Sequence, residues 1–137
     1  MTGLLIDASV WLAARDAHEA HHAEAATVVS GDHHLAVLDL TLYEVANVLM
    51  VRKRSAPDAA ETLALIDRRC GGAVHRADPE TLAVAAKVAI DHRISVYDAA
   101  YVAAAWRNDW TLVSLDERDL VGPGLAIAPG DVPLASG

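Results

Sequence analysis

The sequence predicts an α/β fold in which a parallel β-sheet is covered by helices on both faces. Short aliphatic runs typical of strands alternate along the chain with longer segments whose apolar residues recur at helical spacing. Strands that are separated by helices pair in parallel, because each helix returns the chain to the same end of the sheet. Apolar residues make up 53% of the chain and Phe is absent, so the core must be aliphatic.

The strands are predicted from brief apolar runs that end at polar or turn-forming residues. The first run stops at Asp7, and the fourth ends shortly before Asp116. The predicted strands are residues 3–6, 35–38, 73–75 and 111–114, with an edge strand at 125–127.

The helices are predicted from apolar spacing together with capping residues. Thr41 to Glu44 and Ser95 to Asp98 each fit a capping box, and Pro57 suits the first position of a helix. The predicted helices cover residues 9–15, 17–29, 41–54, 57–70, 78–92 and 95–107, with one helical turn at 116–120.

The whole chain, residues 1–137, is predicted to be one domain with a core over about 3–127 and a loose tail over 128–137. Cys70 is the single cysteine, so no intrachain disulfide can form, which suits a reducing cytoplasm. The first residues lack the features of a signal peptide, and no run approaches the roughly 18 apolar residues of a membrane span.

The formal net charge of −8 argues against binding nucleic acid by broad neutralisation of phosphates. It does not argue against cutting nucleic acid, because carboxylates in one cleft can hold cations that meet the phosphate. Two basic runs, at residues 52–54 and 68–69, are either solvated helix ends or a rim that steers RNA.

Four acids stand in positions that favour a shared site. Asp7 and Asp116 follow strands, at the sheet edge where ligands of parallel sheets collect. Glu44 and Asp98 hold the fourth positions of the two capping boxes, where each could simply cap its helix. Both are followed by apolar residues, however, and a carboxylate in apolar surroundings needs a partner such as a metal ion.

Four motifs in this order resemble those of VapC-type PIN domains, the ribonuclease toxins of bacterial toxin–antitoxin pairs. The resemblance extends from residue 4 to about residue 127. The motifs are Asp7-Ala8-Ser9-Val10-Trp11, Tyr43-Glu44-Val45-Ala46-Asn47-Val48-Leu49, Tyr97-Asp98-Ala99-Ala100-Tyr101 and Leu112-Val113-Ser114-Leu115-Asp116.

The resemblance implies a Rossmann-like sheet with an acidic pocket that holds Mg²⁺ or Mn²⁺. It assigns catalysis to Asp7, Glu44, Asp98 and Asp116. We expect Asp7 and Asp98 to hold the main ion, with the other two acids completing the site or binding a second ion. Such hard oxygen ligands suit magnesium better than zinc.

Three polar residues are expected to support these acids. Ser9 and Ser114 match supporting positions of the family, although members often carry Thr where Ser114 stands. Asn47 shares a helical side with Glu44 and could orient Glu44 or a water, or it could equally be a buried, satisfied amide. Asp119, a further acid near the last motif, could share the role of Asp116, but it is expected to be a surface residue.

By resemblance, the activity is metal-dependent endonucleolytic cleavage of RNA that leaves 5′-phosphate and 3′-hydroxyl ends. Transfer RNA and ribosomal RNA are both substrates of the family. The expected partners are a VapB-like antitoxin, which covers the acidic pocket, and a second copy of the chain in a homodimer.

Other functions fit parts of the sequence. A PIN-like module could bind RNA or a protein without cutting. His18-Glu19-Ala20-His21-His22 matches the zinc-hydrolase pattern HExxH, which needs His18 and His22 on one helical turn. A phosphohydrolase of the haloacid-dehalogenase type needs a second acid two residues after the first, and here that residue is Ser9.

Overall fold

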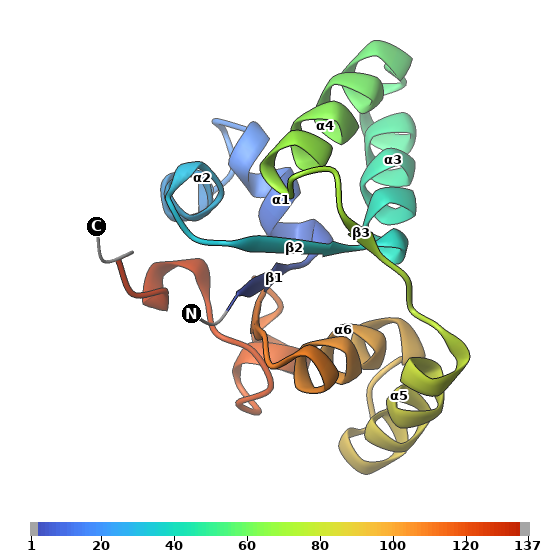
Figure 1. Cartoon of the computed structure of the whole chain (residues 1–137). Coiled ribbons are helices and arrows are strands. Elements are labelled where there is room, and N and C mark those ends of the chain that lie inside the picture. Colours follow the sequence, from blue (N-terminus) through green and yellow to red (C-terminus); the bar gives the residue numbers. More distant parts are fainter. Residues whose placement is uncertain (1–2, 135–137) are drawn as a thin grey trace.

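The structure, a computed structural model that describes residues 3–134, is built on a four-stranded parallel sheet (Figure 1). The order of the strands is β3-β2-β1-β4, so the first strand lies in the middle and the last strand is at one edge. The strands are β1 (Leu4–Ile6), β2 (Leu35–Leu38), β3 (Val74–His75) and β4 (Thr111–Val113).

Helices cover both faces of the sheet, which confirms the predicted fold class (Figure 1). On one face lie α1 (Ala8–Arg15), α2 (His22–Ser30), α3 (Asp39–Lys53) and α4 (Ala56–Arg69). On the other face lie α5 (Pro79–His92) and α6 (Val96–Asn108). Within residues 3–134, no helix is both long enough and apolar enough to cross a membrane.

The alternation of side chains along each strand divides the core into two halves. In β1, Leu4 and Ile6 pack toward α1 to α4, whereas Leu5 packs toward α5 and α6. The second half depends on α6, where every residue from 99 to 105 is at most 3% exposed and five of the seven are Ala. These small side chains let α6 lie close to the sheet, and this brings its first turn to the carboxyl ends of the strands.

The start of α3 differs from the prediction. Thr41 is not the N-cap, because α3 begins two residues earlier, at Asp39. The Asp39 carboxylate accepts a hydrogen bond from the Leu40 N–H at 2.8 Å, and Thr41 is fully buried within the first turn. Glu44 therefore lies in the second turn of α3, where its carboxylate is too far along the helix to cap it.

The chain after β4 also differs from the prediction. The expected edge strand at 125–127 is reduced to a single parallel bridge between Val113 and Ile127. Within the segment expected to be a loose tail, η2 (Pro129–Asp131) forms a 3₁₀ turn that packs against α2, and residues 135–137 lie outside the part of the chain that the structure describes. A ring nitrogen of His33 (Nε2) lies 2.7 Å from the Pro133 carbonyl oxygen, so this segment is held in place as far as residue 133.

The two basic runs have different environments. Arg69 donates hydrogen bonds to the carbonyl oxygens of Val29 and Gly31, so it holds the end of α2. The run at residues 52–54 is exposed at the end of α3. The run at residues 52–54 is thus the one that is free to contact RNA.

Candidate metal centre

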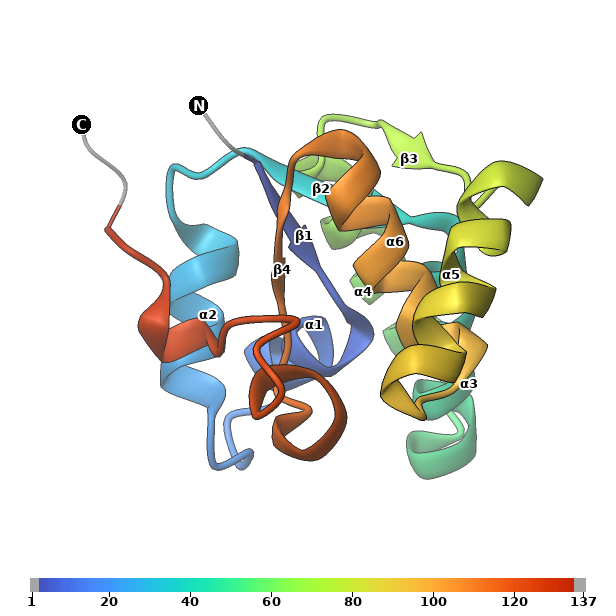
Figure 2. The ribbon, with the colours of Figure 1, turned by 90° about the horizontal axis from the view of Figure 1, so that it is seen from below.

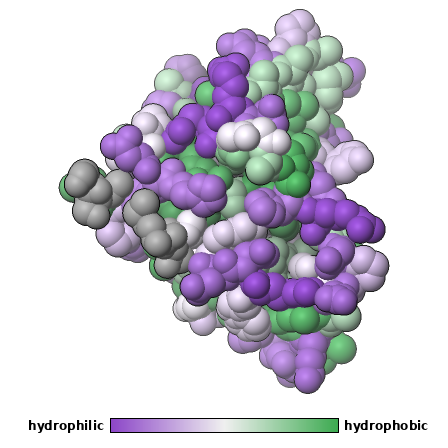
Figure 3. Space-filling model, viewed as in Figure 1, coloured by the Kyte–Doolittle hydropathy of each residue, from purple (hydrophilic) through white to green (hydrophobic). Residues whose placement is uncertain are grey.

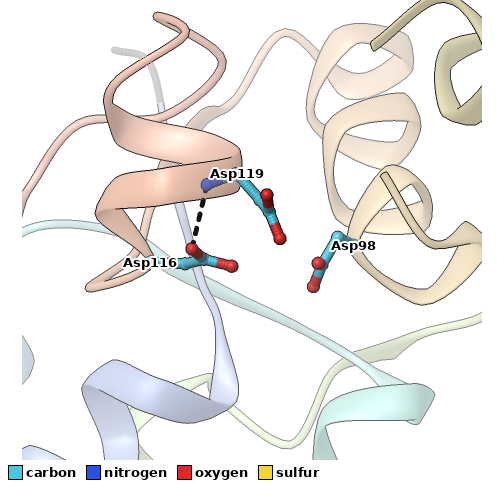
Figure 4. Close-up of side chains that lie close together, drawn as sticks. All are labelled: Asp98, Asp116 and Asp119. Atoms are coloured by element: carbon cyan, nitrogen blue, oxygen red, sulfur yellow. Dashed lines mark hydrogen bonds between the residues drawn. The ribbon is translucent and has the colours of Figure 1, made fainter. Parts of the chain in front are cut away.

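Three aspartates bring their carboxylates together beside the carboxyl ends of β1 and β4 (Figure 4). Asp98 comes from the first turn of α6, and Asp116 and Asp119 come from the segment after β4. One carboxylate oxygen of each lies within 4.8 Å of the others, and all three residues are half-buried. The predicted convergence of Asp98 and Asp116 therefore has a structural counterpart, with a third acid added.

Asp119 joins this cluster because of an unusual turn, η1 (Glu117–Val121), which is π-helical. The Asp116 side chain caps the turn by accepting a hydrogen bond from the Asp119 N–H at 3.0 Å. The wide turn then directs the Asp119 side chain toward Asp98 (Figure 4). The structure places Asp119 in the acidic cluster, as the alternative of a role shared with Asp116 requires, and not at a separate surface position. An acid three residues after a capping acid was the signal in the sequence.

The negative charge of this cluster affects the pKa of Asp98. Burial raises the pKa of its carboxyl above the ordinary value, and repulsion from Asp116 and Asp119 raises it further. The Ser95 hydroxyl accepts a hydrogen bond from the Asp98 N–H at 3.1 Å, so the predicted cap of α6 is confirmed. The cap uses the backbone of Asp98, and this leaves its carboxylate directed toward the other two aspartates (Figure 4).

Asp7 lies deeper, directly after β1, where it caps α1. Its carboxylate accepts hydrogen bonds from the Ser9 hydroxyl at 2.6 Å and from the Val10 N–H at 3.3 Å. Burial raises the pKa of Asp7 to about 6, although hydrogen bonds from Ser114, Ser9 and Val10 lower it; repulsion from Glu44 adds to the increase. A positively charged partner such as a metal ion would stabilise the charged form of this buried acid.

Ser9 and Ser114 connect Asp7 to the segment that carries Asp116. The Ser9 hydroxyl, which donates to Asp7, also accepts from the Leu115 N–H at 3.1 Å. The Ser114 hydroxyl accepts from the Asp116 N–H at 3.0 Å. Figure 2 shows how β1 and β4 run side by side and so bring α1 next to the turn after β4.

Glu44 approaches the same region from α3, and its partner is Tyr101 of α6. The Tyr101 hydroxyl donates a hydrogen bond to Glu44 Oε1 at 2.6 Å and lies 2.9 Å from the Thr41 hydroxyl. Burial raises the pKa of Glu44, the Tyr101 hydrogen bond lowers it, and repulsion from Asp98 raises it again. Tyr101 was not predicted as a site residue, because a tyrosine in an Ala-rich apolar helix is ordinarily a core residue.

Asn47 does not take the place expected for it. The residue is exposed on α3, so the alternative of a buried amide is wrong. Within residues 3–134, the hydrogen bond that holds Glu44 comes from Tyr101 and none comes from Asn47.

The histidine pattern does not form a zinc site of the HExxH type. Residues 17–21 form turns, and α2 begins only at His22, so His18 and His22 do not share a helical turn. His22 Nδ1 lies 2.9 Å from the Ala13 carbonyl oxygen, which engages one ring nitrogen. Within residues 3–134, the three aspartates are the one group of acids, histidines or cysteine whose ligand atoms all lie within 4.8 Å of one another. Asp7 and Glu44, which were expected to share the ion with Asp98 and Asp116, lie beside this group and are not part of it.

The donor set fits a hard divalent cation. All the candidate ligand atoms are carboxylate oxygens, which Mg²⁺ and Mn²⁺ prefer, whereas thiolates and histidines would favour zinc. Repulsion links the acids in a series, from Asp7 to Glu44, from Glu44 to Asp98, and from Asp98 to the other two aspartates. A cation in their midst would relieve the repulsion, so the acidic cluster can bind metal.

Comparisons with known proteins place this site in context. The PIN domain family matches residues 4–121. The chain is 35% identical to Ribonuclease VapC3 of Pyrobaculum aerophilum over 122 residues, which cover 84% of this chain and 90% of the relative.

Solved structures agree with the fold. VapC20 of Mycobacterium tuberculosis, a sarcin-ricin loop cleaving toxin, has a TM-score of 0.70 at 19% identity, with 89% of this chain and 95% of that chain covered. A chain of a toxin-antitoxin complex from Klebsiella pneumoniae has a TM-score of 0.72 at 14% identity, with 95% and 100% covered. At these identities, the likeness supports the architecture rather than the details of the site.

Proposed function

The chain belongs to the PIN-domain family and, within it, to the VapC-type ribonucleases, and from this membership we propose that it is a Mg²⁺-dependent endoribonuclease and the toxin of a toxin–antitoxin pair. The observation that carries the proposal is the meeting of Asp98, Asp116 and Asp119 at the sheet edge, with Asp7 and Glu44 beside them. A folded protein keeps this much mutually repelling charge in one place at a cost in stability, which a bound cation offsets.

We assign the shared metal ion to Asp98, Asp116 and Asp119, and we propose that Asp7 and Glu44, which lie beside this group, complete the site or bind a second ion. Mg²⁺, or Mn²⁺ in its place, would activate water and stabilise the charge that develops on the phosphate and the leaving oxygen. Ser9 and Ser114 hold Asp7 and the Asp116 backbone in fixed positions through their hydroxyls. No side chain needs to attack the phosphorus. By analogy with the family, water would attack it and the 3′-oxygen would leave, which gives a 5′-phosphate and a 3′-hydroxyl end.

The substrate is proposed to be RNA of the transfer or ribosomal class, guided by a rim of cations. A cavity of about 310 Å³ opens beside Ser9 and Leu115, and its wall includes Arg15, Arg52 and Lys53. Basic side chains bind backbone phosphates and so position a nucleic acid strand. Here they would hold the phosphates on either side of the bond that is cut at the acidic cluster. This supports the steering role for the run at residues 52–54.

A homodimer is proposed through apolar side chains that α3 and α5 leave exposed. Val51 is 68% exposed and Ile90 is 80% exposed. Figure 3 shows hydrophobic surface on the side of the molecule where α3 lies and again at α5. Contiguous exposed apolar patches commonly mark protein–protein interfaces, and we propose that these side chains contribute to such a patch.

Replacing Ile90 by Lys is expected to shift the protein from dimer to monomer, because each subunit would bring a charge into the interface. Sedimentation equilibrium measures the change, and Lys87→Arg on the same helix is the control that keeps its charge. A variant that remains dimeric would place the interface elsewhere.

The second proposed partner is a VapB-like antitoxin. The acid cluster would accept a basic side chain of that protein in the position that a cation otherwise takes. A short neighbouring reading frame that encodes a DNA-binding protein, and its co-purification with this chain, would check the assignment.

Cleavage of RNA by the purified protein is expected to need Mg²⁺ or Mn²⁺ and to stop with EDTA. The test is an RNA panel incubated with each metal, followed by sequencing of the RNA ends. Ends with 5′-phosphate that appear only with metal support the proposal. If the protein binds Mn²⁺ and RNA but never cuts, the alternative of a PIN-like binding module is correct.

A further inference from the structure

Tyr101 places a polar group deep between two helices that carry acids. The residue is 2% exposed, and its hydroxyl meets Glu44 Oε1 at 2.6 Å and the Thr41 hydroxyl at 2.9 Å. Thr41 is fully buried. Packing alone would be served by Phe, and the hydroxyl must therefore be explained by these two contacts.

The direction of the two hydrogen bonds follows from the number of protons. A phenol has one proton, and here it is donated to the Glu44 carboxylate, which can only accept. Thr41 must then donate its own proton to the Tyr101 oxygen. The result is a relay in one direction, from Thr41 through Tyr101 to Glu44.

The relay joins the two helices that bring acids to the site. Thr41 and Glu44 are three residues apart on α3, and Asp98 and Tyr101 are three residues apart on α6, so each pair shares a helical side. Within residues 3–134, Oε2 of Glu44 has no hydrogen-bond partner, whereas Oε1 is engaged by Tyr101. Glu44 thus has one oxygen held and one free.

We propose that Tyr101 is a positioning residue for metal binding, which fixes the Glu44 carboxylate so that Oε2 faces the cation, with Thr41 holding the phenol in turn. The inference rests on the proposed function, since it needs a cation at the acid cluster. It deepens that function by giving Glu44 a single ligand oxygen and by adding two residues to the site. Partners of this kind typically change metal affinity or activity by about 10-fold to 100-fold when they are removed.

The test measures the affinity of the metal-free, full-length protein for Mn²⁺ by electron paramagnetic resonance. Tyr101→Phe is expected to weaken binding by about 10-fold or more, because Glu44 then swings freely. Thr41→Val should change affinity in the same direction, and Thr41→Ser, which keeps the hydroxyl, should bind like the wild type. Tyr43→Phe is the matched control, since the Tyr43 side chain is 77% exposed.

A double-mutant cycle separates positioning from packing. In a Glu44→Ala background, Tyr101→Phe should cause no further loss of Mn²⁺ affinity, because the relay no longer ends on a ligand. Wild-type affinity in both Tyr101→Phe and Thr41→Val, whatever their melting temperatures, would overturn the inference and leave the proposed function standing. A wild-type protein that binds no Mn²⁺ would overturn both.

Discussion

Replacing Asp98 by Asn is expected to lower the rate of RNA cleavage at least 1,000-fold, which corresponds to about 4 kcal/mol of transition-state stabilisation. The carboxylate is the one member of the cluster that α6 contributes, and it lies opposite Asp116 and Asp119. Asparagine has nearly the same shape but carries no charge, so the cation loses a main ligand.

The fold should survive this change, because Ser95 caps α6 by accepting a hydrogen bond from the Asp98 backbone N–H, and the Asp98 side chain takes no part in the cap. Burial and neighbouring acids raise the pKa of the Asp98 carboxyl, so the removal of its charge also relieves repulsion. The measurement is single-turnover cleavage at saturating Mg²⁺, with the circular dichroism spectrum as the check on folding.

Glu117→Gln is the matched control, since Glu117 is an exposed acid in the same turn as Asp119. It should cleave RNA at the wild-type rate. If Asp98→Asn and Asp116→Asn both cut RNA as fast as the wild type does, the reaction does not take place at this cluster.

Replacing Asp7 by Asn is expected to abolish cleavage and, without metal, to make the folded protein more stable at neutral pH by about 3 kcal/mol. Burial raises the pKa of this carboxyl from 3.8 to about 6, so the folded protein binds the proton more tightly than the unfolded chain does. Asn can still accept the hydrogen bond that caps α1, so the helix keeps its cap.

The pH dependence gives this prediction its sign. Below about pH 4 the carboxyl is neutral in both states, so Asp7 causes no loss of stability. As the pH rises to about 6, the unfolded chain ionises freely while the folded protein resists, and stability falls; above about pH 6 the loss is complete. Mg²⁺ should recover the loss in the wild type by stabilising the charged form.

Urea unfolding in EDTA at pH 4 and pH 7.5 measures the difference between wild type and Asp7→Asn. The gain should be present at the higher pH and absent at the lower one. Asp91 is an exposed acid on α5, and the control variant Asp91→Asn should show no gain in stability at either pH. A variant that is less stable than the wild type at pH 7.5 would show that the Asp7 charge is already well compensated in the metal-free protein.

Periodicity and capping residues predicted the two-faced parallel sheet, because apolar spacing directly reflects which side chains are buried. They did not predict where α2 and α3 begin. Ala17 to His21 have good helical composition, yet they form turns in the structure. Asp39 supplies an earlier start for α3 than the capping box at Thr41, and the sequence alone offers both.

The sequence placed Asp98 and Asp116 together because strand ends and helix starts meet at one edge of a parallel sheet. Asp119 was missed because a π-helical turn has no periodicity of its own that could be read in five residues. Tyr101 was missed because its role depends on a contact across 57 residues of chain. Local patterns indicate burial, but they do not indicate which buried hydroxyl will meet which acid.

The pairing of β1 with β4 has a consequence for synthesis of the chain. The acids come from residues near the start, the middle and the end, and Asp116 and Asp119 reach the others only when β4 has added to the edge beside β1. A nascent chain on the ribosome therefore lacks a complete site until nearly all of it has emerged. A protein that attacks the RNA of its own cell would in this way stay harmless to the ribosome that is making it.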